Sequence, residues 1–290
     1  MAADRQYFTS FAGNSRAAGA DETLFVPWSR VCAWAAEQDL DMRRALVRLL
    51  TAGVWPERFR RDFGLRTGPQ LCRLLNSRVL VVGCGGLGGA AAEHLTRSGV
   101  GALRLVDKDC FAESNLNRQR FCTEATLGQP KAQVVAQALS QIASYMDIDV
   151  RVLDAGPDTL PALLADVDAV LDCVDSIPLK IQLEAAAGRA GVPFVHGAVL
   201  REEGFAFGHC GPRPRLPDLY PQGKPNPSAE RAAQAVGGLA PSGVAILMTA
   251  LCLKMLLGSG KNGTPACVDS PLYHWDASLP ALESFAWKEE

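Results

Sequence analysis

The sequence predicts an α/β fold: a Rossmann-like, doubly wound, mostly parallel sheet with antiparallel C-terminal hairpins and a small N-terminal helical extension. Three observations predict this class. A buried apolar stretch at 78–82 leads into a glycine-rich turn and then into a helical pattern. Short apolar strands alternate with helical segments after it, which is typical of a parallel sheet. Beyond residue 199 the spacing becomes that of paired strands joined by turns.

The N-terminal part of the chain differs in composition from the rest. Residues 1–25 are rich in Ala, Gly, Ser and Asn, and we expect a flexible arm there. Apolar side chains then recur at helical spacing across 27–51, which predicts two short helices. We therefore divide the chain into an arm with a helical extension, residues 1–55, and one large domain, residues 56–290, in which a first helix spans 69–76.

The large domain carries the repeated strand–helix pattern. Strands are expected at 78–82, 102–106, 150–153, 169–171 and 194–195. Helices are expected between them, at 87–97, 131–142, 158–165 and 177–190. Antiparallel hairpins are predicted at 199–208 and 271–287, and a long loop rich in Pro, Gly and Ser lies between them at 211–242.

Composition excludes several classes of protein. With 290 residues, 48% hydrophobic and 21% charged, the chain is typical of globular proteins. A formal net charge of -2 gives no basic field for nucleic acid, so no nucleic-acid partner is expected. The apolar stretch 243–257 is too short to span a membrane and contains Lys254, so we expect a core helix and no membrane association. The N-terminus lacks a signal-peptide pattern, which predicts a cytoplasmic protein.

Cysteine usage is also informative. The nine cysteines are scattered and odd in number, which argues against a disulfide framework. The chain contains no CxxC pair, so a tetrahedral thiolate zinc site has no support. Cys84 stands inside the glycine-rich turn, where we expect it to pack as a small residue.

The glycine-rich turn is the first motif that carries chemistry. Gly83-Cys-Gly85-Gly86-Leu-Gly88 follows a predicted strand and opens a predicted helix. Its glycines permit a tight turn and close approach of the backbone, and the helix N-terminus offers free N–H groups to a phosphate. Asp107 ends the next strand, where an acid commonly binds a ribose hydroxyl. These features predict a nucleotide site, but they do not separate NAD from ATP.

Polar residues downstream favour ATP. The cations Arg118 and Lys131 suit a polyphosphate, as do the polar side chains of Asn115 and Gln119. Asp175 follows another predicted strand and suits Mg²⁺, which is typically held by one or two carboxylates together with substrate phosphates. An enzyme that transfers hydride needs none of these groups. The sequence therefore predicts ATP and Mg²⁺ as ligands.

These motifs resemble those of the ThiF/MoeB/HesA family of adenylyltransferases, relatives of the ubiquitin-activating enzymes. The matching stretches are VLVVGCGGLGG, LVDKDCFAESNLNRQ, LGQPKAQ and VLDCVDS, followed by VPFVHGAVLREEG and GGLAPSGV, and they cover about residues 56–287. The resemblance implies that 56–290 is an ATP-binding adenylation domain in which Arg118, Lys131 and Asp175 are catalytic, with magnesium on Asp175. The nucleotide-binding residues that it implies are Gly83, Gly85, Gly86, Gly88, Asp107, Ser114, Asn115, Gln119 and Ser176.

The resemblance also implies a homodimer. In this family an arginine of an Arg-Tyr-x-Arg motif before the first strand reaches into the partner's site. The segment Arg58-Phe-Arg-Arg61 is similar, with Phe in place of Tyr, so Arg61 is predicted to act in trans. Because other arginines surround it, a solvated surface charge is the alternative.

Two departures from the family pattern stand out. Many members bind structural zinc with two CxxC pairs, which would fall near 215–221 and at the C-terminus, and both are absent here. With the helices in 27–55, this indicates a zinc-less subtype with an N-terminal helical extension. Some members also form a covalent adduct through a loop cysteine, but 222–241 contain none, so the reaction is expected to end at an acyl-adenylate. Cys210, the nearest thiol, is expected to be a buried small residue.

The function that the resemblance implies is ATP-dependent adenylylation of a ubiquitin-like sulfur-carrier protein. The target would be the C-terminal Gly carboxylate of a MoaD/ThiS-like partner ending in Gly-Gly, for sulfur transfer in molybdopterin/tungstopterin or thiamin-type cofactor biosynthesis. Such a carboxylate is ionised at pH 7, so no general base is needed, and His196 is expected to be a core or site-lining residue. Open alternatives are a relative acting on a tRNA base or a peptide, an NAD-dependent oxidoreductase, and a non-catalytic nucleotide-binding scaffold.

Overall fold

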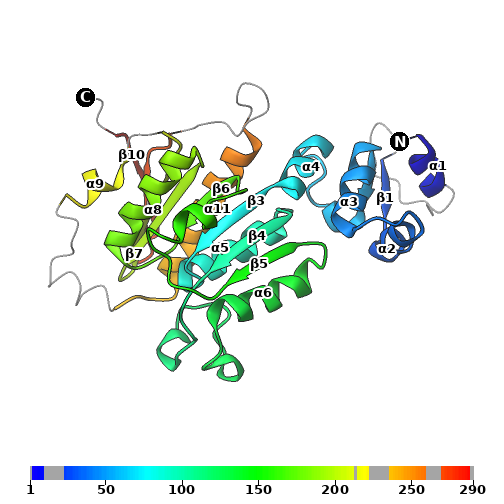
Figure 1. The fold of residues 1–290 in the computed structure, drawn as a ribbon. Helices are drawn as coiled ribbons and strands as arrows, with labels where there is room; N and C mark the ends of the chain where they lie inside the picture. The colour runs from blue at the N-terminus through cyan, green and yellow to red at the C-terminus, as the bar shows by residue number, and fades with distance from the viewer. Residues whose placement is uncertain (1, 10–22, 212–213, 222–234, 259–268, 288–290) are drawn as a thin grey trace.

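The computed structural model describes residues 2–9, 23–211, 214–221, 235–258 and 269–287. An eight-stranded sheet with the order β10-β9-β8-β7-β6-β3-β4-β5 forms its centre (Figure 1). The strands are β3 Arg78–Val82, β4 Ala102–Val106, β5 Asp147–Arg151, β6 Ala169–Asp172, β7 Phe194–Leu200, β8 Glu203–His209, β9 Leu272–Asp276 and β10 Ala281–Phe285. The adjacent strands β7, β6, β3, β4 and β5 run parallel to one another, whereas β8 pairs antiparallel with β7 and β9, and β10 pairs antiparallel with β9. This is the fold class that the sequence predicts.

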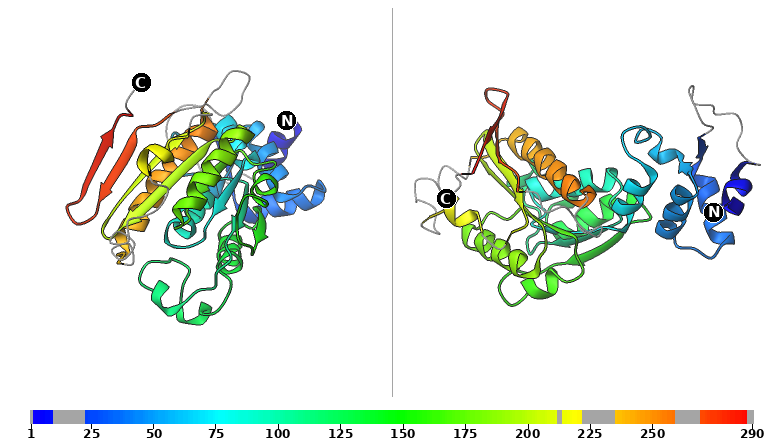
Figure 2. Two further views of the ribbon diagram at one scale, coloured as in Figure 1. Left: turned by 60° about the vertical axis from the view of Figure 1, so that its left-hand side comes forward. Right: turned by 90° about the horizontal axis from the view of Figure 1, so that it is seen from above.

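Helices cover both faces of the sheet (Figure 2). One layer contains α5 Gly86–Arg97, α6 Lys131–Ile142 and α11 Leu239–Leu257, and the other contains α7 Leu160–Leu163, α8 Ile177–Ala190 and α9 Leu216–Leu219. Successive residues of one strand point to opposite faces, so Val79 and Val81 of β3 join the cluster under α5 and α11. Leu80 and Val82 join the cluster under α7 and α8. The described residues also contain three short 3₁₀ turns: η1 Glu57–Phe59, η2 Glu113–Asn115 and η3 Glu124–Thr126.

The apolar helix α11 is a core helix. By length and composition it could cross a membrane, but 56% of its apolar window is buried inside the molecule. It packs against α5, β7 and β8, and glycines in the two strands let it approach closely. A Cβ atom on Gly197 would lie 2.2 Å from the Met248 sulfur, and one on Gly208 would lie 2.4 Å from Met255 Cε. The helix begins at Leu239, before the predicted start at Gly243.

The N-terminal layer has an apolar cluster of its own. The N-terminal layer consists of α1 Ala2–Thr9, β1 Leu24–Val26, α2 Trp28–Glu37, α3 Met42–Thr51, β2 Val54–Pro56 and α4 Gly68–Asn76. The two predicted helices in 27–51 are confirmed as α2 and α3. Leu71 and Leu75 of α4 belong to this cluster, so α4 joins the layer to the large sheet. The division of the chain near residue 55 stays a prediction.

The flexible arm is wrong for Ala2–Thr9, which is helical. The flexible arm was predicted from the many small and polar residues in 1–25. Phe8, however, is 1% exposed and packs edge-on against Trp34. Asp4 also pairs with Arg48 at 2.6 Å. Both contacts come from residues distant in the sequence. Residues 10–22 of the predicted arm lie outside the described residues.

Several strand boundaries differ from the predicted ones. β5 begins at Asp147 rather than at 150, because the acids that open this edge strand are neutralised by arginines of β3 and β4. Arg78 lies 2.7 Å from Asp147, and Arg104 lies 2.7 Å from Asp149. The parallel pair of β1 and β2 was missed, since each strand has only three residues. The predicted short strand at 194–195 and the first half of the 199–208 hairpin are one continuous strand, β7.

The close contacts of α5 give a stability prediction. Gly88→Ala is expected to lower the free energy of unfolding by about 1–3 kcal/mol, because its Cβ would lie 1.7 Å from the carbonyl oxygen of Gly83. Gly89→Ala is the matched control, since its nearest atom is 3.4 Å away and alanine is favoured over glycine in a helix by about 0.5–1 kcal/mol. Urea unfolding measures both variants, and equal losses would contradict the packing argument.

Candidate functional site

The glycine-rich turn connects β3 to α5 at the carboxyl edge of the sheet. Gly83 has a φ of 92°, and a Cβ there would lie 2.6 Å from the Cys173 carbonyl oxygen. Gly85 occupies the N-cap of α5, which therefore has no side-chain cap, so the first N–H groups of this 12-residue helix are open to a ligand. Cys84 is buried, as predicted. The turn thus provides the geometry of a phosphate-binding site.

Asp107 fixes the shape of this turn. Its Oδ2 accepts a hydrogen bond of 2.7 Å from the Cys84 N–H, and its Oδ1 accepts one of 2.8 Å from the Asp109 N–H. The carboxylate retains lone pairs for a further donor such as a ribose hydroxyl. Its predicted nucleotide role stays a prediction, and its contact with the glycine-rich turn is an additional structural role.

The segment after β4 brings three more predicted residues close to the turn. Asn115 is buried and accepts a 3.0 Å hydrogen bond from the Ala112 N–H. Lys131 opens α6, and its buried ammonium lies 3.3 Å from Asp109 Oδ2. The buried Gln119 lies against Gly85, where a Cβ would be 3.4 Å from Nε2.

One buried polar atom beside the turn has no partner. Gln119 Oε1 makes no hydrogen bond to any part of the chain that the structure describes. Buried polar atoms normally are hydrogen-bonded, so an unpaired amide oxygen beside open helix N–H groups indicates a polar ligand. The open helix N-terminus and the Lys131 ammonium fit a nucleotide triphosphate at this place.

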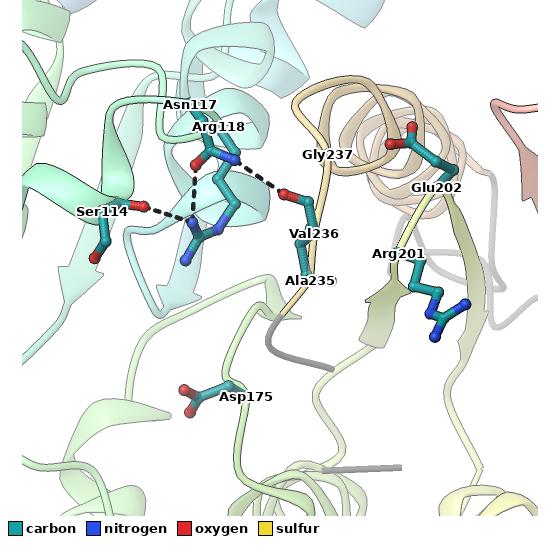
Figure 3. A pocket seen from close by; sticks show the side chains of 9 residues that line it. All are labelled: Ser114, Asn117, Arg118, Asp175, Arg201, Glu202, Ala235, Val236 and Gly237. Carbon is teal, nitrogen blue, oxygen red and sulfur yellow. Dashed lines mark hydrogen bonds between the residues drawn. The ribbon is translucent and has the colours of Figure 1, made fainter. Parts of the chain in front are cut away.

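A pocket of about 970 Å³ lies beside the turn (Figure 3). Its lining residues are Ser114, Asn117, Arg118, Asp175, Arg201, Glu202, Ala235, Val236 and Gly237. Three of these, Ser114, Arg118 and Asp175, are site residues that the sequence predicts. A Cβ on Gly86 would lie 3.4 Å from the Arg118 carbonyl oxygen, so the pocket wall is adjacent to the glycine-rich turn.

Hydrogen bonds hold one wall of this pocket. Arg118 donates to the Ser114 carbonyl oxygen at 2.8 Å and to Asn117 Oδ1 at 2.9 Å. Asn117 in turn donates to the Val236 carbonyl oxygen at 3.0 Å. Asp175 stands in the turn between β6 and α8 and is exposed, so its carboxylate is available to a cation in the pocket.

Some predicted residues lie away from the pocket lining. The glycines, Asp107, Asn115, Gln119 and Lys131 surround the adjacent turn instead. Ser176 is the exposed N-cap residue of α8 and makes no side-chain capping bond. Arg61 is exposed on the segment before α4 and is not among the pocket residues of its own chain. Its predicted action in a partner's site stays a prediction.

The arginines around Arg61 have local partners. Arg58 is stacked over Trp28 at 4.4 Å and donates to the Ile142 carbonyl oxygen at 2.8 Å. Arg60 pairs with Glu57, and Arg66 pairs with Asp62. These contacts explain the density of arginines in 58–66 by packing and surface ion pairs.

Sequence reasoning missed the other pocket residues. Asn117 lies inside the NLNRQ motif and could have been included on that ground. Arg201 and Glu202 form the β7–β8 turn, and Ala235, Val236 and Gly237 lie shortly before α11. Arg201, Glu202 and Gly237 lie in the stretches VPFVHGAVLREEG and GGLAPSGV that resemble the family, which is the signal that could have found them. Their position beside Arg118 depends on the path of the chain.

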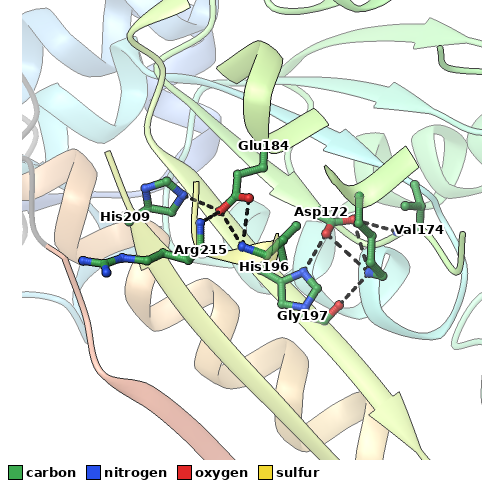
Figure 4. A network of polar contacts seen from close by, with 9 residues as sticks. Asp172, Val174, Glu184, His196, Gly197, His209 and Arg215 are labelled. Carbon is green, nitrogen blue, oxygen red and sulfur yellow. Dashed lines mark hydrogen bonds and ion pairs between the residues drawn. The ribbon is translucent and has the colours of Figure 1, made fainter. Parts of the chain in front are cut away.

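A buried ionic cluster surrounds Asp172 at the end of β6 (Figure 4). His196 Nδ1 lies 2.6 Å from Asp172 Oδ2, and Lys180 Nζ lies 3.3 Å from both oxygens of that carboxylate. Lys180 also donates to the Gly197 carbonyl oxygen at 3.0 Å. Asp172 accepts from the Val174 N–H at 3.3 Å, so the cluster supports the turn that carries Asp175.

Burial and charge set the protonation of this cluster. Burial by itself would raise the pKa of Asp172, but the Lys180 charge and the His196 hydrogen bond hold that pKa below its ordinary value. Burial lowers the pKa of His196, and the Lys180 charge lowers it further, so the imidazole is neutral at pH 7. His196 is fully buried, which agrees with its predicted place in the core.

The role of Asp175 as a magnesium ligand stays a prediction. Across the described ranges of the chain, no three His, Cys, Asp or Glu side chains gather as a metal site. The absence of zinc stays a prediction. Cys210, expected to be buried, is half-buried.

Known proteins show similarity along most of the chain. The ThiF family model matches residues 60–281. The molybdopterin-synthase adenylyltransferase of Escherichia coli is 44% identical over 131 residues, which cover 45% of this chain and 53% of that protein. The SAMP-activating enzyme E1 of Haloferax volcanii is 32% identical over 219 residues, 74% of this chain and 78% of that protein. The alignment with the E. coli relative thus spans about half of its length.

Solved structures that share the fold include two E. coli enzymes. E. coli MccB with AMPCPP and MccA superimposes with a TM-score of 0.66 at 18% identity, over 79% of this chain and 71% of that one. E. coli tRNA N6-threonylcarbamoyladenosine dehydratase, TcdA, in complex with ATP superimposes with a TM-score of 0.59 at 22% identity. The superposition covers 69% of this chain and 94% of that one. At this identity the likeness shows the fold alone.

The buried cluster gives a second stability prediction. Asp172→Asn is expected to lower the free energy of unfolding by about 3–5 kcal/mol, because it leaves the Lys180 charge buried without a counter-charge. Asp269→Asn is the control, since its ion pair with Arg215 is half exposed and should contribute about 1 kcal/mol or less. Denaturant unfolding compares them, and similar small losses would show that Lys180 is not charged in the folded state.

The lowered pKa values of two histidines predict that the free energy of unfolding decreases at acidic pH. The folded-state pKa of His196 lies below its unfolded value, so its contribution is complete above about pH 6.5 and is lost as the pH falls from there toward the folded-state pKa. The pKa of His94 is also lowered by burial and adds to the same window. Unfolding free energies between pH 7.5 and 5.5 should fall by up to about 1.4 kcal/mol per pH unit for each histidine. His196→Asn should reduce this slope, and an unchanged slope would contradict the assignment.

Proposed function

Since this chain belongs to the ThiF family of E1-like adenylyltransferases, we propose that it adenylylates the C-terminal glycine carboxylate of a ubiquitin-like sulfur-carrier protein with ATP. The observation that carries this proposal is the meeting of Arg118 and Asp175 in one pocket beside an uncapped helix N-terminus. The names of the relatives from E. coli and H. volcanii support the reaction class. Sulfur transfer for a molybdopterin- or thiamin-type cofactor is the pathway class that we propose.

The described residues suit the polyphosphate. The N–H groups that open α5 at Gly86 would receive phosphate oxygens, and Lys131 and Arg118 would neutralise their charge. Asp107 would bind the ribose at the end of β4. Asp175 would hold Mg²⁺ together with the phosphates, and the ion would supply positive charge as pyrophosphate departs.

The chemistry that we propose needs alignment more than proton transfer. An oxygen of the carrier's carboxylate attacks the α-phosphorus, the bond to the bridging oxygen of the β-phosphate breaks, and pyrophosphate leaves. The products are an acyl-adenylate and pyrophosphate. The attacking carboxylate is already ionised at neutral pH, so no side chain has to remove a proton. Lys131 and Arg118 favour the transition state, in which negative charge moves onto the leaving group.

Buried His196 fits this proton-free route. Its Nδ1 is occupied by Asp172, and the side chain has no exposed surface, so it has no access to a substrate. The segment 222–241 contains no cysteine, and we therefore propose that the activated carrier leaves as the acyl-adenylate.

We further propose a homodimer in which Arg61 completes the partner's site. Arg61 is exposed, and it makes no ion pair or hydrogen bond within the described residues, in contrast to Arg58, Arg60 and Arg66. An arginine supplied from a neighbouring subunit commonly stabilises charge in phosphoryl transfer.

Other acceptors are the main alternative. MccB and TcdA share the fold with this chain, but their identity is too low to choose among carrier, peptide and tRNA acceptors. The net charge of -2 does not favour tRNA, because phosphate backbones require clustered cations.

Isotope exchange between ATP and pyrophosphate in the presence of Mg²⁺ tests the proposed function. Exchange should appear only when a small ubiquitin-like protein ending in Gly-Gly is present, and Lys131→Ala should reduce its rate by about 100-fold or more, because a buried cation next to the phosphates is lost. Lys254→Ala, which removes an exposed lysine of α11, is the control and should behave as wild type. Tight ATP binding without exchange for any such carrier would contradict the proposal.

A further inference from the structure

The β7–β8 hairpin extends past the end of β6, while β8 stays paired with β9 up to Glu203. β6 ends at Asp172, which pairs with His196, whereas β7 continues to Leu200. Each strand residue advances by about 3.3 Å, so the end of β7 stands roughly 13 Å past this last pair. The turn of the hairpin consists of Arg201 and Glu202, and both residues line the pocket opposite Arg118 (Figure 3).

Arg201 occupies an unfavourable backbone conformation for its residue type. Its φ is 57°, in the left-handed region where glycine or asparagine is preferred in tight turns. Residues kept in such conformations occur preferentially at functional sites. A turn selected for stability alone would favour glycine at this position.

The backbone of Arg201 is held by the segment that closes the pocket. The Gly237 N–H donates to the Arg201 carbonyl oxygen at 3.2 Å, and Arg201 and Val236 form a parallel bridge. Val236 is also the acceptor of Asn117 on the opposite wall. The position of Arg201 relative to the Arg118 wall is therefore fixed through the main chain of Val236 and Gly237 and the side chain of Asn117, and none of these contacts uses the Arg201 side chain.

The guanidinium of Arg201 is free for a ligand. It makes no ion pair or hydrogen bond with any residue that the structure describes, and the exposed side chain is one of those that line the pocket. Glu202 does not neutralise it, because Glu202 points toward Gly237 (Figure 3). A Cβ on Gly237 would lie 2.2 Å from Glu202 Oε1. Arg118, by contrast, already donates to Ser114 and Asn117.

We propose that Arg201 binds the C-terminal carboxylate of the acceptor protein. This inference rests on the proposed function, in which that carboxylate must lie beside the nucleotide. The phosphates have their own donors at the glycine-rich turn and Lys131, whereas the wall formed by the β7–β8 hairpin offers one unpaired guanidinium. A guanidinium matches the planar carboxylate with two parallel hydrogen bonds, and lone pairs remain on the oxygens for the attack.

The test compares Arg201→Gly with wild type and with Arg189→Ala. Glycine suits the left-handed turn, so Arg201→Gly should fold at least as stably as wild type while losing the guanidinium. Arg189 is exposed near the end of α8, at the opposite edge of the sheet, and is the control for loss of one arginine. The readouts are the Kd for ATP, the KM for a ubiquitin-like protein ending in Gly-Gly in pyrophosphate exchange, and the thermal midpoint.

Arg201→Gly should raise the KM for the carrier by about 10- to 100-fold, the range for one charge-assisted contact, with the Kd for ATP unchanged. Arg201→Lys should recover only part of the loss, because it keeps the charge without the fork of donors. An unchanged KM would overturn the inference. A Kd for ATP weakened by the same factor would also overturn it, since Arg201 would then be a phosphate ligand.

A binding measurement that does not depend on catalysis tests the inference apart from the proposed function. If wild type catalyses no exchange, the inference is judged by equilibrium binding of a synthetic peptide ending in Gly-Gly, as the free acid and as the amide. Wild type should bind the acid about 10-fold or more tightly than the amide, and Arg201→Gly should lose this preference. Equal binding of acid and amide by wild type would overturn the inference.

Discussion

The site depends on a backbone contact between the ends of two central strands. A Cβ on Gly83 would lie 2.6 Å from the Cys173 carbonyl oxygen, so only glycine lets the turn after β3 touch the turn after β6. This contact places the uncapped N-terminus of α5 next to the loop that carries Asp175. Phosphate-binding amides and a carboxylate for a cation thus become neighbours, although they are far apart in the sequence.

A buried ion pair between Asp172 and Lys180 supports the loop that carries Asp175. Asp172 is fully buried, and its charge is balanced by Lys180, while His196 stays neutral. Because Asp172 also accepts the Val174 N–H, the buried pair fixes the start of the turn that presents Asp175. The exposed carboxylate of Asp175 therefore follows a turn that is held by the buried pair of Asp172 and Lys180. The opposite wall is built differently, from main-chain contacts between the β7–β8 hairpin and Val236 and Gly237.

Much of the fold was predictable because its signals are local. The apolar strand before Gly83, the glycine spacing and the periodicity of α5 and α6 depend on neighbouring residues. Arg118 and Asp175 were identified by their residue types after predicted elements, and Ser114 by the resemblance to the family, and the structure brings all three to one pocket. The helix Ala2–Thr9 was not predictable, because its stability comes from Phe8 packing on Trp34.

The missed site residues share one physical cause. Arg201 reaches the pocket because β7 continues past the end of β6, and the extension of one strand past its neighbour is not encoded in a local pattern. The positive φ of Arg201 is likewise visible only in three dimensions. Val236 and Gly237 are positioned by hydrogen bonds to residues more than 30 positions away.

In the proposed reaction this chain transfers an adenylyl group to a protein carboxylate. Intact mass spectrometry of a ubiquitin-like protein ending in Gly-Gly, incubated with the enzyme, ATP and Mg²⁺, measures this transfer. We expect a mass increase of one adenylyl group that requires a free C-terminal carboxylate. An unmodified carrier in the presence of ATP-bound enzyme, or an adduct that persists when the C-terminus is amidated, would contradict it.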